Sequence, residues 1–549
     1  MLSQAFTPKL ATALKSYNKE RFIKDLMSGI IVGIVALPLA IAFGIASGVT
    51  PEKGLFTAII AGFIISALGG SMVQIGGPTG AFIVIVYGIV QQFGVNGLII
   101  ATFIAGIMLV LMGVFKMGSV IKFIPHPLIV GFTTGIAVII FSSQIKDFFG
   151  LKMGAVPADF LGKWESYSHN LGSFNYMAVL LCISTVAINQ LWPRVSRKIP
   201  GSLVAIVATT AIVQIFNLPV ETIGKKFGAI HAGFPSPVVP HLDIETLKKL
   251  IGPAFTIALL GGIESLLSAV VADGMTGGNH RSNIELIAQG IANMASSLFG
   301  GIPATGAIAR TATNIKNGGN TPVAGIIHAI TLLIIVLFVG KWAALIPMAT
   351  LAGILVVVSY NMSEWRNFVS ISSGPRSDAA ILWVTFLLTV LVDLTVAIEV
   401  GMVLASFLFM AKFVKYSNVR QVGDEGENPL ANYSIPEGVM VFEITGPLFF
   451  GAAYKFKDSI KIIEDAPKVL IVRMRNVPMI DATGIHTLEE VEKACHQRNT
   501  KLILSEISNS DVMEELRKAR ILFKIGKSNV VPTLDAAIAR SGVLCGERG

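Results

Sequence analysis

Two short segments, GGSMVQIGGPTGAF at 69–82 and GGIPATGAIARTATN at 300–314, hold the residue types best suited to binding chemistry. Each begins with Gly-Gly and places Pro and Thr ahead of an apolar stretch. A helix start offers unpaired N–H groups and a partial positive charge, so residues 78–81 and 305–309 could point two such ends at one anion. The alternative is that the glycines serve only close helix packing.

A cation accompanies these segments. Arg310 lies one turn into the second segment, with no acid beside it. Placing Arg in a membrane costs ~2.5 to 3.5 kcal/mol, so we expect it to face a cavity in which an anion is its partner. Backbone carbonyls, Glu264 or water at the membrane surface are the alternative partners. Gln74 and Tyr87 border the first segment and are expected to line the same cavity.

A carboxyl group accompanies them as well. Glu264 lies within LLGGIESLLSAVV, with Ser265 beside it and Ser268 one turn further on. A carboxyl group in such an apolar helix could take up and release a proton near neutral pH, which makes Glu264 the candidate for coupling to protons. Oxygen atoms of Glu264 and Ser268 could instead hold sodium. The third alternative is a carboxylate that is permanently paired with Arg310.

The composition indicates where these residues lie. The chain has 549 residues, of which 53% are apolar and only 14% are charged. Its mean hydropathy is +0.70. Residues 1–420 contain 27 Lys and Arg and 16 Asp and Glu, whereas residues 421–549 contain 16 and 18. Because a soluble protein carries about 25% charged residues, the first part is predicted to be a membrane domain and the second a polar domain. A soluble enzyme is therefore excluded.

Other classes of function are disfavoured by what the sequence lacks. The net charge of +9 is not gathered in a basic stripe with interleaved aromatic residues, so we expect no nucleic-acid partner. The three cysteines, Cys182, Cys495 and Cys545, form neither a disulfide framework nor a metal-spaced cluster. We expect no metal site and no other cofactor. The N-terminus lacks the pattern of a cleaved signal peptide.

Apolar segments recur along the first part of the chain and predict fourteen membrane spans. The spans are 26–46, 54–69, 79–92, 95–115, 127–145, 173–192, 200–216, 250–272, 284–300, 305–316, 323–340, 343–361, 378–393 and 395–414. Lys and Arg gather before the first span and after even-numbered ones, which places both ends of the chain in the cytoplasm. The interrupted segments are each third in a group of seven, a pattern typical of an inverted-repeat transporter with a midplane site.

Four regions follow from these patterns. We expect a basic cytoplasmic N-terminus at 1–24, a membrane domain at 25–416, a polar linker at 417–435 and a small α/β domain at 436–549. In the last region, apolar runs favour strands and 3.6-residue periodicity favours helices. The predicted strands lie within 439–450, 468–477 and 500–507, and the predicted helices are 451–463, 484–497 and 510–520.

The chain resembles the sulfate permease (SulP) family, the bacterial relatives of solute carrier family 26. The resemblance is carried by RFIKDLMSGIIVGIVALPLAIAFGIASG, GGSMVQIGGPTGAF, GGIESLLSAVVADGMTGGNHRSNIELIAQGIANM and GPLFFGAA, and it covers almost the whole chain. Through IESLL, DGMTG, AIAR and NMSE, the chain looks most similar to bacterial aerobic C4-dicarboxylate transporters.

The resemblance implies an all-α membrane domain of seven plus seven segments, divided into core and gate subdomains, with a cytoplasmic STAS domain behind it. It also implies a homodimer that works by an elevator-like motion in the bacterial inner membrane. By motif position, the substrate-binding residues would be Thr79, Gly80, Ala81, Phe82, Ala307, Ile308, Ala309 and Arg310. Glu264 matches an acidic position that resembles a proton-linked site where it is Glu and a sodium site where it is Asp.

The polar tail resembles anti-sigma-factor antagonists, in which a strand-helix loop Asp-Ser-Ser-Gly is phosphorylated on its second Ser. Here the loop is Asp481-Ala482-Thr483-Gly484, so Thr483 is a candidate phosphosite. The simpler interpretation is a loop in which Asp481 or Thr483 caps the helix. A cytosolic regulatory partner of this domain is also expected.

Together these features predict a secondary transporter of a small anion that is coupled to protons. C4-dicarboxylate is the preferred substrate, followed by sulfate and then bicarbonate. A sodium-coupled bicarbonate or sulfate carrier, an anion exchanger and an uncoupled channel are the alternatives, followed by a nucleobase permease and a membrane sensor.

Overall fold

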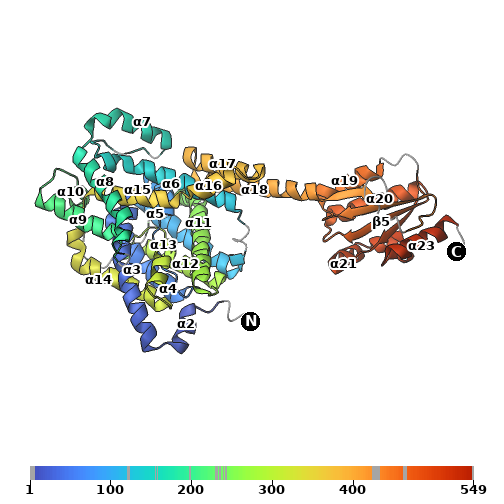
Figure 1. Cartoon of the computed structure of the whole chain (residues 1–549), viewed down its shortest axis with the longest axis horizontal. Coiled ribbons are helices and arrows are strands. Elements are labelled where there is room, and N and C mark those ends of the chain that lie inside the picture. Colours follow the sequence, from blue (N-terminus) through green and yellow to red (C-terminus); the bar gives the residue numbers. More distant parts are fainter. Residues whose placement is uncertain are drawn as a thin grey trace. The chain divides into compact units, whose positions relative to one another are not determined.

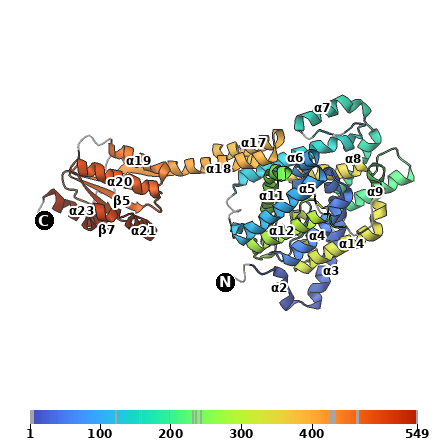
Figure 2. The same ribbon diagram turned by 180° about the vertical axis from the view of Figure 1, so that it is seen from behind.

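The computed structural model describes residues 6–119, 124–154, 156–157, 159–196, 199–228, 233, 236–238, 240, 244–422, 433–461 and 466–546. The chain divides into two compact units, Met1–Val403 and Leu404–Gly549. The first unit is helical, and the second contains a sheet covered by helices (Figures 1 and 2).

The first unit is built from apolar helices that follow the predicted spans, and the last of these helices continues past Val403 into the second unit. Their bounds are α3 Lys19–Ala46, α4 Pro51–Leu68, α5 Ile83–Val114, α6 His126–Phe149, α8 Tyr176–Leu191, α9 Gly201–Ile215, α11 Ile244–Thr276, α12 Ser282–Leu298, α13 Ile308–Lys316, α14 Pro322–Ala343, α15 Met348–Met362, α17 Arg376–Leu391 and α18 Leu394–Tyr416. Shorter helices are α2 Lys9–Ala13, α7 Phe160–Asn170, α10 Ile223–Phe227 and α16 Trp365–Ser372. Within the described residues, seven helices are long and apolar enough to cross a membrane.

Helix α5 holds two predicted spans in one element. Its backbone leaves the helical region at Gly94, where φ is 67° and ψ is −173°. A positive φ is easily reached only by a residue without a Cβ, so Gly94 separates the two spans predicted at 79–92 and 95–115.

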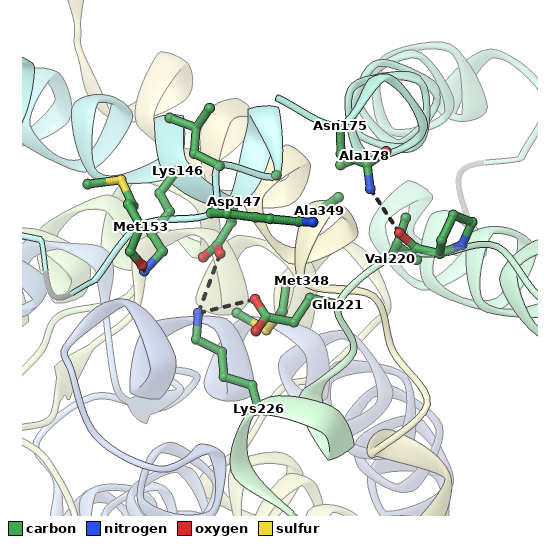
Figure 3. A pocket seen from close by; sticks show the side chains of 14 residues that line it. Lys146, Asp147, Met153, Asn175, Ala178, Val220, Glu221, Lys226, Met348 and Ala349 are labelled. Carbon is green, nitrogen blue, oxygen red and sulfur yellow. Dashed lines mark hydrogen bonds and ion pairs between the residues drawn. The ribbon is translucent and has the colours of Figure 1, made fainter. Parts of the chain in front are cut away.

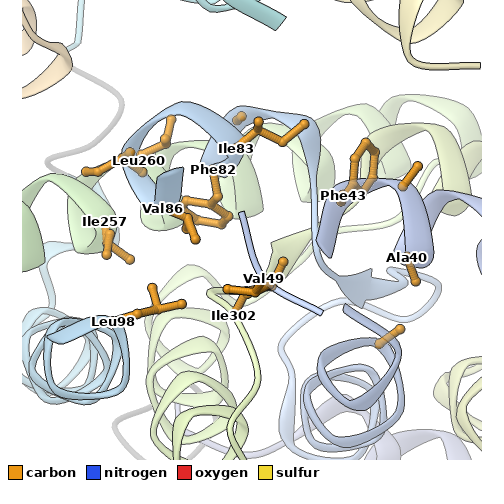
Figure 4. Close-up of a cluster of buried hydrophobic side chains, with 14 of the residues drawn as sticks. Ala40, Phe43, Val49, Phe82, Ile83, Val86, Leu98, Ile257, Leu260 and Ile302 are labelled. Carbon is orange, nitrogen blue, oxygen red and sulfur yellow. The ribbon is translucent and has the colours of Figure 1, made fainter. Parts of the chain in front are cut away.

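The helices pack in two groups. Helices α3, α4, α5, α11, α12 and α14 pack on one another, and α6, α8, α9, α15 and α17 form the second group. This division matches the predicted core and gate subdomains. Phe82 is fully buried, and it shares one apolar cluster with Phe43 of α3, Leu260 of α11 and Ile302 (Figure 4). The apolar cluster therefore fixes the residues that begin α5 against α11 and α3.

The second unit is a five-stranded sheet with the order β3-β4-β5-β6-β7. The strands are β3 Asn418–Gln421, β4 Val439–Thr445, β5 Val469–Asn476, β6 Lys501–Ser505 and β7 Val530–Val531. Strand β3 is antiparallel to β4, and the remaining neighbours are parallel. The helices are α19 Phe450–Lys461, α20 Ala482–Gln497, α21 Ser510–Lys518, α22 Ile521–Ile525 and α23 Leu534–Cys545.

The predicted linker differs from the structure at its start. Residues 418–421 form strand β3 and pair with β4. This strand has only four residues and alternates between exposed and half-buried positions, so it carries no apolar run that would mark a strand. Residues 423–432 of the predicted linker lie outside the described residues. The sequence patterns also missed three other elements of this domain, which are α22, the two-residue strand β7 and α23.

Candidate functional site

Two very short strands bring the interrupted segments together. Strand β1, Gly76–Gly77, pairs antiparallel with β2, Thr305–Gly306. Beyond the strands, the backbone N–H of Ala307 donates to the oxygen of Ile75 at 2.8 Å. The turn of 3-10 helix at Gly80–Phe82, which leads into α5, and the start of α13 therefore follow directly from a shared two-stranded ladder.

Glycine is required at this ladder by close contacts. Gly77 has φ of +153°, and a Cβ there would overlap the Nη1 atom of Arg310. A Cβ at Gly306 would overlap the side-chain amide of Gln74. The backbone of β1 thus packs against the Arg310 side chain, and the backbone of β2 packs against the Gln74 side chain.

Arg310 is buried behind the paired strands. Its side chain is 2% exposed, and its Nη2 donates to the carbonyl oxygen of Pro78. The Nη1 atom is buried and finds no acceptor among the described residues. A guanidinium carries five N–H donors, and leaving one unpaired away from water is costly. Of the alternative partners expected for Arg310, a backbone carbonyl therefore binds one nitrogen of the guanidinium group. The other nitrogen, Nη1, is left free for an anionic acceptor.

Glu264 contacts the other helix start. Its Oε2 accepts a hydrogen bond from the Thr79 hydroxyl at 2.9 Å. Thr79 has an extended backbone and precedes the turn at Gly80–Phe82. The carboxyl group is therefore linked to the first interrupted segment, and no ion pair joins it to Arg310 among the described residues.

The predicted substrate-binding residues divide into exposed and buried groups. Ile308 is 43% exposed and Ala309 is also exposed, at the first positions of α13, where helix N–H groups have no partner within the helix. Thr79 is half-buried. Gly80 faces the side chains of Phe43, Ile140 of α6 and Met362 of α15, so the second helix group forms a wall opposite it. The remaining members, Ala81, Phe82 and Ala307, are buried.

A chain of hydrogen bonds supports the ladder from behind. The Gln74 Nε2 donates to the Ser265 hydroxyl at 2.9 Å, and that hydroxyl donates to Oε1 of Glu285 at 3.0 Å. Glu285 also accepts from the Gly70 N–H at 2.7 Å and from Gln289 Nε2 at 3.0 Å. The structure thus places Gln74 and Ser265 in one network that fixes the start of the first interrupted segment.

Glu285 was not among the residues predicted from the sequence, although its side chain is completely buried. It is the second residue of the span predicted at 284–300, a position where an acid normally marks a helix end near water. The signal that could have found it is an acid followed at i+4 and i+8 by Gln289 and Asn293, which lie on one helix face.

Two supporting candidates have other contacts. The Ser268 hydroxyl lies 3.3 Å from that of Thr311, and Thr311 accepts from the Ile75 N–H at 3.0 Å. Through Thr311, Ser268 thereby stabilises the backbone just before β1. The Tyr87 hydroxyl donates to the Val156 oxygen at 2.7 Å, and the Nζ of Lys163 lies 5.4 Å from its ring centre. The described contacts of Tyr87 are therefore with the segment between α6 and α8 rather than with Arg310 or Glu264.

Another cavity, of about 300 Å³, lies among α6, α10 and α15 (Figure 3). Lys226 lies 3.4 Å from Asp147 and 3.9 Å from Glu221. Lys146 donates to two backbone oxygens, those of Met153 and Gly154. Lys226 and Lys146 already have acceptors, and the third lysine of the lining, Lys152, is exposed. This cavity therefore offers an anion less than the buried, unpaired Nη1 of Arg310 does.

Two interrupted helices that meet end to end at a buried cation define an inverted-repeat carrier of the kind that holds anionic groups at half-helix starts. The matching family models agree with that class. The model described as "Sulfate permease family" matches residues 22–385, and the model described as "STAS domain" matches residues 431–537. The chain belongs to the sulfate permease family, and its fold and carboxyl-terminal domain are those predicted from the sequence.

Named relatives cover most of the chain. It is 43% identical over 524 residues to "Putative sulfate transporter YvdB" of Bacillus subtilis, covering 94% of this chain and 97% of the relative. It is 33% identical over 491 residues to "Bicarbonate transporter BicA" of Picosynechococcus, covering 86% of each. The murine Slc26a9 anion transporter structure, in the inward-facing state, matches with a TM-score of 0.88 at 20% identity, covering 99% of this chain and 95% of that one. The last match shows the fold alone.

Proposed function

We propose that the protein is a secondary active transporter that moves a small anion with protons by elevator-like alternating access. The observation that carries the proposal is the buried Nη1 of Arg310, which has no acceptor among the described residues and lies beside the paired strands. In the proposed cycle, the anion accepts from this nitrogen and from the N–H groups at the start of α13, while α6 and α15 cover it.

Glu264 is the proposed proton carrier. Its hydrogen bond with Thr79 ties the carboxyl group to the other helix start. An ionised carboxylate accepts from the Thr79 hydroxyl, whereas a protonated one can donate a hydrogen bond itself. Proton uptake therefore changes the charge and hydrogen bonding within the same site that receives the anion. Sodium held by Glu264 and Ser268 is the alternative, but Ser268 already bonds to Thr311.

The substrate we propose first is an inorganic oxyanion, sulfate or bicarbonate, because the named relatives are described as transporters of these anions. The sequence motifs alone favoured C4-dicarboxylates, and the names of these relatives do not support that preference. A dicarboxylate remains the third candidate. All three anions offer oxygen acceptors to one guanidinium nitrogen and a helix start, so transport has to distinguish them.

The discriminating experiment is uptake of labelled sulfate, bicarbonate and succinate into proteoliposomes with an imposed proton gradient and, separately, a sodium gradient. Saturable, acid-driven accumulation of one anion supports the proposal. Accumulation driven only by sodium favours the sodium-coupled carrier. Exchange without net accumulation, or current without saturation, favours the exchanger and the channel, and a protein that moves none of these anions favours a nucleobase permease or a sensor.

Arg310→Ala tests the anion site. Loss of a hydrogen bond to a charged group costs about 1.5 to 3 kcal/mol, so the affinity for the anion should fall at least ~10-fold. Lys316→Ala is the matched control, because Lys316 is exposed at the other end of the same helix. Normal uptake by correctly inserted Arg310→Ala protein would refute the proposed anion site.

Glu264→Gln tests the coupling. The variant should transport the anion down its gradient but lose the acceleration by external acid, because an amide cannot take up the proton. Glu245→Gln provides the control, since Glu245 is exposed at the start of the same helix and pairs with Lys249. An unchanged pH profile in Glu264→Gln would count against proton coupling.

Assembly and regulation complete the proposal. We place the protein as a homodimer in a bacterial inner membrane, with both chain ends in the cytoplasm. Thr483 is exposed near the start of α20, and Asp481 caps that helix by accepting from the Gly484 N–H at 2.8 Å. The capping role is present in the structure, and an exposed hydroxyl at position 483 supports phosphorylation or binding of a cytosolic partner.

A further inference from the structure

The carboxyl-terminal domain carries a basic surface patch that transport does not use. Between Leu516 and Leu534 the chain has five basic residues and no acidic one. Lys518 pairs with Glu514 and Glu515, and Lys524 pairs with Glu489. The other three, Arg517, Arg520 and Lys527, are exposed, and none has an ion pair among the described residues.

An aromatic side chain lies among these unpaired cations. Arg517, Arg520, Leu522, Phe523, Lys527 and Val530 line an open surface hollow of about 710 Å³. Phe523, on the short helix α22, is 81% exposed. Burying a phenyl ring from water is favourable, so such exposure within a cluster of cations indicates a surface that another body covers. We call residues 517, 520, 523 and 527 the basic patch.

The position of the patch in the domain indicates what covers it. Membrane helix α18 ends at Tyr416 and β3 begins at Asn418. The Nζ of Lys455 in α19 donates to the oxygens of Val414 at 2.6 Å and Ser417 at 2.9 Å. The end of the last membrane helix is thus bonded directly to the polar domain, within the one unit that begins at Leu404.

The hollow and that helix end lie at the same end of the strands, although β3 and β7 are the two outer strands of the sheet. Because β3 is antiparallel to β4 and its parallel neighbours, the start of β3 lies at the carboxyl ends of β4, β5 and β6. Helix α21 follows the carboxyl end of β6, and Val530 of the hollow pairs with Leu504 near that end. Figures 1 and 2 both show α21 at the end of the domain from which α18 emerges.

We propose that the basic patch binds the anionic headgroups of the membrane leaflet at which α18 ends, with Phe523 inserted among them. Clusters of Lys and Arg next to a membrane helix attract anionic lipids over about a Debye length, and an aromatic side chain adds apolar burial at the interface. This inference rests on the charge and position of the patch, and it holds independently of which anion is carried. It assigns the polar domain a second anchor besides α18.

The test uses the full-length protein in nanodiscs of phosphatidylcholine alone or mixed equally with phosphatidylglycerol. A fluorophore is attached through Ser528→Cys in a Cys545→Ser background, since Cys182 and Cys495 are buried. Brominated acyl chains then quench the label where it approaches the bilayer. Nanodiscs present both leaflets, so the result does not depend on the direction of insertion.

Quenching should be at least about threefold stronger in the anionic discs and should decline as salt is raised. Arg520→Glu with Lys527→Glu should reduce it to the level of neutral discs, and Phe523→Ser should weaken it in both disc types. The matched control is Lys468→Glu with Lys501→Glu, which changes the net charge equally at the opposite, amino-terminal edge of the sheet.

Two results would overturn the proposal. Equal quenching in neutral and anionic discs would mean that the lipid charge is not recognised, and an acidic protein would then be the better occupant of the patch. An equal loss in the control pair would mean that net charge rather than the patch governs the approach to the bilayer. Uptake is measured in every variant as well. Retained uptake confirms that the variant is folded, so a negative quenching result then counts against the lipid-binding proposal and not against the transport proposal.

Discussion

Glu285→Gln is the sharpest test of the network behind the paired strands. The carboxylate accepts three hydrogen bonds, from Gly70 N–H, Ser265 and Gln289, at 2.7, 3.0 and 3.0 Å. A glutamine retains one acceptor oxygen, which can keep the bond from Gly70. Its new amide group is a donor and faces two groups that now donate, so the hydrogen bonds of Ser265 and Gln289 must rearrange.

The expected loss of folding stability follows from the change in these three hydrogen bonds. A bond to a charged acceptor contributes about 1.5 to 3 kcal/mol and a neutral one about 1 kcal/mol. Gln289 can turn its amide over and recover one neutral bond, because its own Oε1 has no partner among the described residues. The neutral amide is also easier to bury than the carboxylate. We therefore expect a net destabilisation of about 2 to 4 kcal/mol.

Unfolding by sodium dodecyl sulfate in mixed micelles measures that free energy, and uptake measures its effect on transport. Ser265 would lose its acceptor, and the hydroxyl that accepts from Gln74 would no longer be held in one orientation. KM should therefore rise roughly tenfold for ~1.4 kcal/mol of lost positioning. Glu245→Gln, at an exposed ion pair, should change stability by less than ~0.5 kcal/mol. If Glu285→Gln matched the wild type in both assays, the network would not position the site.

Three further predictions concern other parts of the chain. Gly306→Ala places a Cβ against the Gln74 amide and should abolish uptake, whereas Gly274→Ala enters open space and should leave uptake unchanged. Burial lowers the pKa of Lys163 to about 8, so the unfolded chain binds more protons between pH 8 and about 10.5 and stability should rise with pH across that window. Thermal unfolding of Lys163→Met should lose this rise. Arg473→Met leaves Glu506 without its cation, whereas Glu443 keeps Arg420, and it should destabilise the carboxyl-terminal domain by about 3 kcal/mol in pulse proteolysis.

The membrane fold was largely predictable because span length, glycine breaks and loop charges are local signals. The break at Gly94 was anticipated between two predicted spans, and the interrupted segments at 69–82 and 300–314 do meet. What local patterns could not supply was the way they meet. Three of the four residues in these strands are glycine, so there is no apolar alternation, and the one β-branched residue, Thr305, does not mark a strand by itself. Their pairing therefore depends on tertiary contacts.

The partners of the site residues were harder to predict than the residues themselves. The sequence singled out Glu264 and Arg310 because charges are rare in apolar segments. The sequence could not show that Glu264 bonds to Thr79 or that Arg310 bonds to Pro78, since these contacts join segments that are far apart in the chain. Tyr87 was expected to line the cavity, but its hydroxyl, about one turn along α5, donates to the backbone of the segment between α6 and α8.

The pairing of Gly76 with Gly306 also bears on how the protein is made. These residues are 230 positions apart in the sequence, so the ladder cannot close until more than half of the chain has left the ribosome. Until then, the polar groups of the first interrupted segment and its neighbours lack the partners that the second half supplies. During synthesis, the first interrupted segment therefore stays without these partners until the second half of the chain has been inserted.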